Sequence, residues 1–222
     1  MQQEDIIKDI RKRCRMAMNG VASASMRQHG LEYKLNFGLS IQQLKDLAKR
    51  YEPSVELAEA LWRENTRELK ILATLLYPAE SFTESEAADW VSEIPNQEIR
   101  EQICANLLQV LSFANQIAQA WVCSSDIEIR ITGYWLLARL FIAKKNEAIL
   151  VDKLPFIWTD IISENIFLRK ASLLALKHIG RQSKGLADSI LQKVSVHKNE
   201  ENLIKREAFD SIAFEFDYFF ED

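Results

Sequence analysis

Apolar and polar residues recur with a helical period through residues 126–142. Asp126 is a good N-cap residue, and Glu128 places an acid in the first turn, where the helix dipole favours it. Arg130 follows one turn inside the start. The apolar positions form one wide face: Ile127, Ile131, Tyr134, Trp135, Ala138 and Phe141. The pattern predicts an amphipathic helix over 126–142.

The same arrangement, a basic residue early in an amphipathic helix, returns along the chain. Its aligned members, at successive spacings of 30, 30, 39 and 37 residues, are Lys70, Arg100, Arg130, Arg169 and Arg206. Helical pairs that repeat at such intervals are typical of HEAT-like units, which stack and bury a continuous core. The repeat predicts an all-α fold, a right-handed α-α superhelix or solenoid of HEAT-like (ARM-like) helical repeats.

No segment alternates with period two for long enough to predict a strand, and the linkers are short. A single domain is expected over 1–222, with N-terminal helices in 1–35, repeats in 36–213 and an acidic aromatic tail, 214–222, that closes the last repeat. Ser40 and Thr83 are expected to cap helices. The expected helices cover 4–18, 22–29, the segment after Ser40, 55–62, 67–76, 84–93, 96–112, 114–123, 126–142, 147–163, 165–179, 184–196 and 200–217.

The charge is unevenly distributed, which changes what a net charge of −4 implies about partners. Residues 1–50 contain 10 Lys/Arg and 5 Asp/Glu, whereas 51–125 contain 4 and 12. Residues 126–213 contain 14 Lys/Arg and 11 Asp/Glu, and the charged residues of the tail 214–222 are all acidic. A local basic surface can therefore bind a polyanion despite the acidic total.

Composition excludes several classes of protein. The longest apolar run falls short of the roughly 18 residues that a membrane span needs. Cys14, Cys104 and Cys123 are far apart, as expected for reduced thiols in a cytoplasmic, monomeric protein. The three histidines lack a second ligand at helical spacing, and no nucleophilic triad, phosphate-binding glycine loop or dinucleotide fingerprint is present, so neither a metal nor a cofactor is predicted.

Several motifs, in this order, resemble the AlkD-type DNA alkylation repair family. They are Asn36-Phe-Gly-Leu-Ser40, Leu57-Ala-x2-Leu-Trp62, Arg67-Glu-Leu-Lys-Ile-Leu-Ala73, Trp90-Val91, the helix 127–138, Phe167-Leu-Arg-Lys-Ala171 and Lys205-Arg-Glu-Ala208. The resemblance covers nearly the whole chain. It implies a curved HEAT-like solenoid and a glycosylase that excises N3- and N7-alkylated purines. It also implies Lys and Arg against the DNA backbone, with an aromatic pair and an aspartate acting at the cationic deoxyribose.

The chain departs from the family where the chemistry is expected. The family's Trp-Trp-Asp-x-x-Asp segment aligns with Gln97–Gln102, which places Gln102 at the key aspartate. A further expected aromatic aligns with Leu174, and the catalytic-site arginine falls at or beside Arg130. Glu98 and Glu101 are the only carboxylates near the right place; the alternative is that they are helix-terminal acids that complement the dipole. An amide would offer a cationic sugar only a dipole, so the catalytic machinery is predicted to be altered or lost.

A set of basic residues on successive repeats is the predicted DNA-backbone-binding site. We call this set the basic ridge: Arg100, Arg130, Arg169, Lys170, Lys205 and Arg206. The alternative for each residue is an ion pair inside the solenoid, for which Glu68, Glu98, Glu128 and Glu164 are available.

Three functions are consistent with the sequence. The first is a family member that binds DNA in a concave basic groove without the usual chemistry. The second is an active alkylpurine glycosylase with a substitute glutamate. The third is a scaffold for a protein partner that does not bind DNA.

Overall fold

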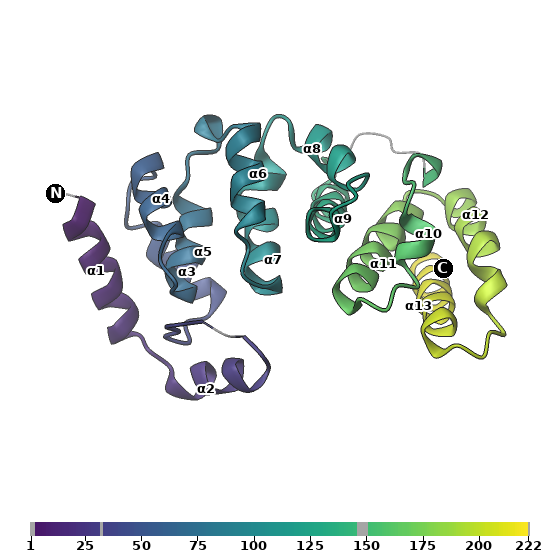
Figure 1. Cartoon of the computed structure of the whole chain (residues 1–222), viewed down its shortest axis with the longest axis horizontal. Helices are drawn as coiled ribbons and strands as arrows, with labels where there is room; N and C mark the ends of the chain where they lie inside the picture. The colour runs from purple at the N-terminus through teal and green to yellow at the C-terminus, as the bar shows by residue number, and fades with distance from the viewer. Residues whose placement is uncertain (1–2, 32, 146–150, 222) are drawn as a thin grey trace. The chain divides into compact units, whose positions relative to one another are not determined.

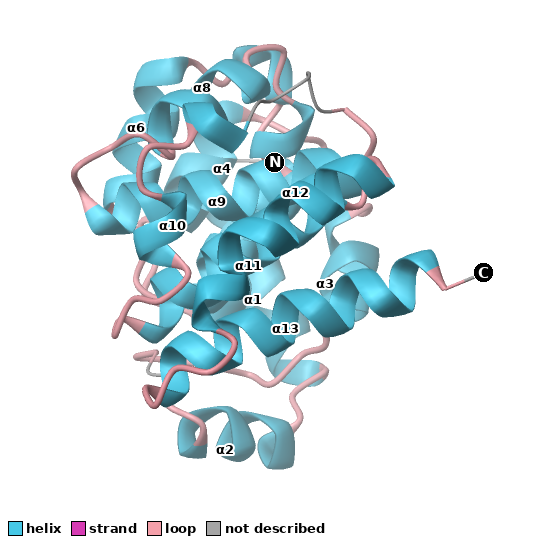
Figure 2. Ribbon diagram, turned by 90° about the vertical axis from the view of Figure 1, so that its right-hand side faces the viewer, coloured by secondary structure: helices cyan, strands magenta, loops and turns pink. Residues whose placement is uncertain are grey.

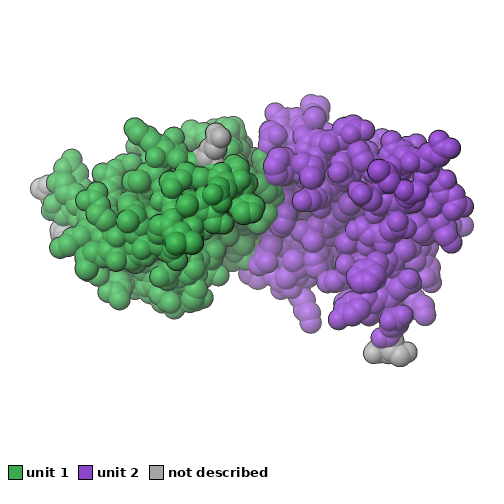
Figure 3. All heavy atoms as spheres, turned by 90° about the horizontal axis from the view of Figure 1, so that it is seen from below, with its two compact units in different colours: residues 1–111 green, residues 112–222 purple. Residues whose placement is uncertain are grey.

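The structure, a computed structural model, describes residues 3–31, 33–145 and 151–221. It divides into two compact units, residues 1–111 and 112–222 (Figure 3), and each is described by itself. Across the described residues the regular elements are all helical (Figure 2). A lone parallel bridge joins Leu35 to Thr66. The all-α prediction is confirmed.

Unit 1 consists of seven α-helices and two 3-10 turns within its described residues (Figure 1). α3 and α7 both pack against α5, which also pairs with α4. Because α5 is covered on these sides, eight of its ten residues are buried. The helices are α1 (Gln3–Met16), α2 (Gly20–Gln28), α3 (Ile41–Ala48), α4 (Val55–Trp62), α5 (Arg67–Leu76), α6 (Glu84–Ser92) and α7 (Gln97–Asn106), with turns Ala79–Ser81 and Leu108–Val110.

Unit 2 repeats this plan around α9, which packs against α8 on one side and α11 on the other. α11 in turn contacts α13, and α10 and α12 lie against α11. The helices are α8 (Ala114–Trp121), α9 (Ile127–Ile142), α10 (Ile157–Asp160), α11 (Ile166–Gly180), α12 (Lys184–Val194) and α13 (Leu203–Phe220), with 3-10 turns Val151–Lys153 and Ser195–His197.

One glycine sets the spacing of the central helix pair in unit 2. A Cβ on Gly133 would lie 2.7 Å from the backbone nitrogen of Val122 and 2.8 Å from the carbonyl carbon of Trp121. Only a residue without a side chain lets α9 approach the end of α8 this closely. The glycine therefore serves packing, although it weakens the helix that contains it.

Most of the predicted helix starts are confirmed by their caps. The Ser40 and Thr83 hydroxyls each accept a backbone N–H three residues on, and Gln43 and Glu86 complete a capping box in each case. The Asp126 carboxylate accepts the N–H groups of residues 128 and 129. The sequence pattern and local hydrogen bonding agree at these three positions.

Three expected segments differ from the structure. The helix expected over 96–112 ends at Asn106, and the 3-10 turn Leu108–Val110 follows it. Residues 147–150 lie outside the described residues, and over 151–163 the prediction of one helix is wrong. Pro155, which lacks an N–H and disfavours helix at the preceding residue, separates the turn Val151–Lys153 from the four-residue α10. The aromatic segment expected as a tail continues α13 to Phe220. Within it Phe216 is buried against Gly180, whereas Phe214 is 73% exposed and its ring stacks on that of Tyr218.

None of the helices in the described part of the chain is both long enough and apolar enough to cross a membrane.

Candidate nucleic-acid interface

A buried carboxylate holds the loop before α3 in unit 1. Glu68, fully buried near the start of α5, accepts the backbone N–H groups of Phe37 at 3.0 Å, Gly38 at 3.0 Å and Leu39 at 3.3 Å. Gly38 has φ +77°, and a Cβ there would lie 2.2 Å from the carbonyl oxygen of Asn19. The Asn-Phe-Gly-Leu motif is thus a backbone cradle around one glutamate, and glycine is required at its tightest point.

Arg67 connects this cradle to the next repeat. Its guanidinium donates from Nη1 to the Leu39 carbonyl at 2.7 Å, and from Nε and Nη2 to both carboxylate oxygens of Glu98 at 2.7–3.0 Å. The Tyr33 hydroxyl donates to Glu98 Oε2 at 2.8 Å. Burial works to lower the pKa of Arg67, but Glu98 and Glu68 outweigh it and raise that pKa. Glu98 is therefore a structural partner of Arg67.

Unit 2 contains the same arrangement at Arg130. Its Nε donates to Asp160 Oδ2 at 2.8 Å, and Nη1 donates to the Ser124 carbonyl at 2.7 Å. The Tyr134 hydroxyl donates to the same Asp160 oxygen at 2.9 Å. Burial and Asp160 raise the pKa of Tyr134, which stays a neutral donor. The guanidinium also lies over the Phe156 ring, 4.5 Å from its centroid. An arginine, a carboxylate from the following repeat and a tyrosine thus form one buried unit.

These networks decide which members of the basic ridge can reach DNA. Arg130 is buried in its ion pair, and Arg100 is buried with Nη1 donating to Gln97 Oε1 at 2.9 Å. Arg130 therefore matches the alternative of an internal ion pair, although its acid is Asp160 and none of the four glutamates named from the sequence. Arg100 is also buried, with the amide of Gln97 as a hydrogen-bond partner. Because a phosphate contact needs an exposed cation, neither residue is carried into the interface proposed below.

The remaining four members of the ridge lie in the first two turns of α11 and α13. Lys170 and Arg206 are exposed. Arg169 is half-buried and donates to the Ser163 carbonyl, and Lys205 is half-buried with its Nζ 3.0 Å from Glu200 Oε1. Since α11 and α13 pack against each other, these cations lie near the starts of two neighbouring helices of unit 2.

The window expected to carry catalysis is amide-rich. Gln102 is half-buried, and its Oε1 accepts from Asn106 Nδ2 at 3.3 Å. That nitrogen also donates to the Thr74 hydroxyl at 2.9 Å. Glu101 is half-buried, and its Oε1 accepts from Gln97 Nε2 at 3.1 Å. Burial raises the pKa of Glu101, which is the wrong direction for a group that must be an anion beside a cationic sugar.

The sequence reasoning missed Arg67, Asp160 and the two tyrosines. A signal for the first two exists, because each arginine and its acid lie about one repeat apart: Arg67 and Glu98 are separated by 31 residues, and Arg130 and Asp160 by 30. The tyrosines occupy different places relative to their arginines, and only the fold brings them to the carboxylates. Trp62 of α4 and Trp90 of α6 are buried and stack with ring centroids 4.1 Å apart, so both are packing residues of unit 1.

The fold and these networks define a protein of the HEAT-like helical-repeat class with interlocking buried ion pairs. One solved structure similar to the chain is described as "a new family of proteins related to the HEAT-like repeat DNA glycosylases with affinity for branched DNA structures". It has a TM-score of 0.71 and 16% identity, and the match covers 98% of this chain and 95% of that one. A search of curated proteins finds no match.

A family profile described as DNA alkylation repair enzyme matches residues 10–212. The chain belongs to this family.

Proposed function

We propose that the protein binds DNA through its phosphate backbone and that it lacks the glycosylase chemistry typical of its family. The proposed lack of glycosylase chemistry rests on Glu98, because both of its carboxylate oxygens already accept hydrogen bonds from Arg67 and Tyr33. Gln102 stands at the position of the expected aspartate, and the remaining carboxylate of that window, Glu101, is half-buried, accepts from Gln97 and has a pKa that burial raises, which disfavours its anionic form.

Family membership and the exposed cations of unit 2 support DNA binding. Lys170 and Arg206 lie on the two packed helices α11 and α13, and each can meet a phosphate without breaking a buried pair. Arg169 and Lys205 flank them. The affinity for branched DNA described for the similar solved structure suggests that DNA of that kind belongs among the ligands tested.

Fluorescence anisotropy with a blunt 20-base-pair duplex over a series of salt concentrations tests this proposal. Lys170→Glu and Arg206→Glu should each weaken binding to duplex DNA whatever its sequence. Each should also reduce the slope of log K for DNA binding against log salt concentration by about 1. Lys184→Glu is the matched control, because Lys184 is an exposed cation at the start of α12 that belongs to neither helix of the interface. Equal effects of all three substitutions would contradict a localised interface.

An active glycosylase that uses Glu101 is the second candidate, since the raised pKa of that side chain is a perturbation often found at functional sites. Incubation with duplex DNA containing N7-methylguanine, followed by cleavage at abasic sites, distinguishes the two. Strand cleavage that disappears in Glu101→Gln would establish this candidate. A salt-sensitive complex without cleavage is the result that we expect. Absence of both signals would leave the protein-scaffold function.

A further inference from the structure

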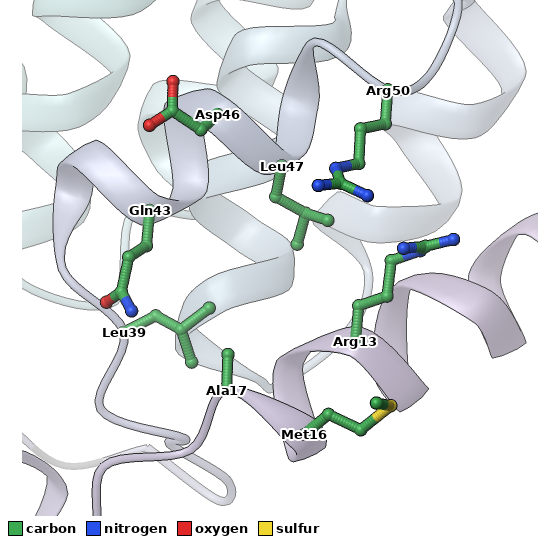
Figure 4. A pocket seen from close by; sticks show the side chains of 8 residues that line it. All are labelled: Arg13, Met16, Ala17, Leu39, Gln43, Asp46, Leu47 and Arg50. Atoms are coloured by element: carbon green, nitrogen blue, oxygen red, sulfur yellow. The ribbon is translucent and has the colours of Figure 1, made fainter.

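A hollow of about 380 Å³ lies between the end of α1 and α3 in unit 1 (Figure 4). Its volume is within the range of small-ligand sites in proteins. Its floor is apolar, since Leu39 is 2% exposed and Leu47 is 8% exposed. Met16, which is 78% exposed, extends this apolar surface at the edge.

Two guanidinium groups lie on one side of the hollow in Figure 4, those of Arg13 and Arg50. Arg13 is anchored, because its Nε donates to Asp9 Oδ2 at 2.7 Å and Asp9 also accepts from the Tyr51 hydroxyl at 2.8 Å. Arg50 is exposed, and its side chain has neither a hydrogen bond nor an ion pair within the described residues. Two cations at one rim repel each other, and an anion placed between them would relieve that repulsion.

The opposite side of the hollow carries Gln43 and Asp46 (Figure 4). Both Asp46 oxygens are already engaged, Oδ1 by Lys49 at 2.7 Å and Oδ2 by Gln42 at 3.1 Å. The Oε1 of Gln43 accepts the backbone N–H of Ser40, which leaves its amide nitrogen as a donor. The polar groups still available around the hollow are therefore mainly donors, which suits an anionic ligand.

We infer that this hollow is a subsite for one unpaired nucleotide of bound DNA. Arg13 and Arg50 hold its phosphate, and its base lies on the surface formed by Leu39, Leu47 and Met16. The inference rests on the proposed function. A paired base cannot fill the hollow because its faces are covered by the neighbours in the stack, whereas an unpaired base offers a free face to an apolar surface and to a guanidinium plane. The subsite gives the protein a preference for DNA with a single-stranded tail or branch over blunt duplex.

The test compares two DNA hairpins by anisotropy, one blunt and one with a four-nucleotide single-stranded tail. In both, a labelled non-nucleotide linker closes the stem, so that only the tailed hairpin contains unpaired nucleotides. Wild-type protein should bind the tailed hairpin about fivefold or more tightly, the low end of what a stacked base contributes. Arg50→Ala should remove this difference. Lys45→Ala is the matched control, since it removes one exposed charge from the same segment without touching the hollow, and it should retain the difference.

A second variant tests whether the tail preference depends on the volume of the hollow, without a change in its charge. Ala17 is exposed and lines the hollow, so Ala17→Trp fills it without a change in charge or loss of a buried contact. This variant should bind the blunt hairpin like the wild type and lose the tail preference, with an unchanged unfolding midpoint.

A tail preference that is absent in the wild type, or that survives in Ala17→Trp, overturns the subsite. Salt-dependent binding of the blunt hairpin would then still support the proposed function, whereas binding of neither hairpin contradicts both. A synthetic peptide of residues 214–222, which is acidic and aromatic, tests whether the hollow is instead a peptide site. That alternative holds if the peptide binds the wild type but not Ala17→Trp, while each of these two proteins binds the blunt and the tailed hairpin equally well. That result also overturns the subsite.

Discussion

Replacing Glu98 by glutamine separates a structural role of this residue from a catalytic one. The carboxylate accepts Nε and Nη2 of Arg67 with both oxygens and also accepts the Tyr33 hydroxyl. The Arg67 side chain is only 2% exposed. A glutamine offers one acceptor oxygen, and its NH₂ group faces a donor where the second oxygen was. The guanidinium then loses its main counter-charge in a place where water cannot substitute.

The expected loss of stability depends on the hydrogen-bond acceptors that Arg67 keeps in Glu98→Gln. Breaking a buried ion pair by removing one partner costs about 3–5 kcal/mol. Arg67 keeps Glu68 Oε1 at 3.1 Å and the Leu39 carbonyl at 2.7 Å, so we expect the low end, about 3 kcal/mol of unfolding free energy. Urea unfolding followed by tryptophan fluorescence measures it, since Trp62 and Trp90 lie in the same unit. A lower midpoint at unchanged m would report lost stability rather than a changed denatured state.

Glu101→Gln is the matched control, because it makes the same chemical change three residues on in the same helix, where the carboxylate accepts a single hydrogen bond from Gln97. It should not destabilise. Ordinary surface substitutions change the unfolding free energy by no more than about 0.5 kcal/mol. If the unfolding free energy of Glu98→Gln lies within that range of the wild type, the structural role of Glu98 is wrong. If Glu98→Gln keeps its stability but loses release of an alkylated purine that the wild type shows, Glu98 is catalytic after all.

Three further predictions concern stability. Asp160→Asn should destabilise unit 2 by about 3–5 kcal/mol, since Arg130 loses its counter-charge and keeps one amide oxygen and backbone carbonyls as acceptors. A urea midpoint equal to that of the wild type would contradict this. Burial raises the pKa of Glu101 above its ordinary value of 4.5, so ionisation of this side chain opposes folding at neutral pH, and the penalty fades as the pH falls toward 4.5. Glu101→Gln should therefore be more stable than the wild type at pH 7, and the difference in unfolding free energy should disappear near pH 4. A constant difference across this pH range would argue against burial of the charge as its origin. Gly133→Ala should lower the unfolding free energy by about 1–3 kcal/mol, because the new methyl group forces α8 and α9 apart. Gly185→Ala, where a Cβ meets nothing within 4 Å, should instead stabilise α12 by up to about 1 kcal/mol. Thermal unfolding measures both variants, and a stability gain in both would refute the close approach at Gly133.

The helices were predictable because their signals are local. Ser40, Thr83 and Asp126 act within a few residues of themselves, and the apolar faces follow the helical period. The segment after residue 147 was mispredicted over 151–163, since its apolar residues fit a helix and only Pro155 indicates the break.

The candidate site was less predictable because exposure depends on the whole fold. The sequence places Arg100, Arg130 and Arg169 at equivalent points of successive repeats, yet the first two are buried and the third is half-buried. The period identifies equivalent positions without showing which of them faces water. The partner of Arg130 illustrates this point, since Asp160 comes from the short helix whose place in the sequence was mispredicted.

The two arginine networks bear directly on the proposed loss of catalysis. In this chain the start of α7 supplies Glu98 to Arg67 of the preceding repeat, just as α10 supplies Asp160 to Arg130. An acid placed in this way stabilises the contact between repeats, and its charge is neutralised by the guanidinium that it holds. It cannot also stabilise a cation on a substrate unless the arginine is displaced, which would expose the cradle around Glu68. A glycosylase built on this frame would need its anion elsewhere, at the position where this chain has Gln102, whose amide oxygen already accepts from Asn106. The chain thus has ion pairs that join neighbouring repeats, and it has an amide, Gln102, at the position that the resemblance aligns with the family's aspartate.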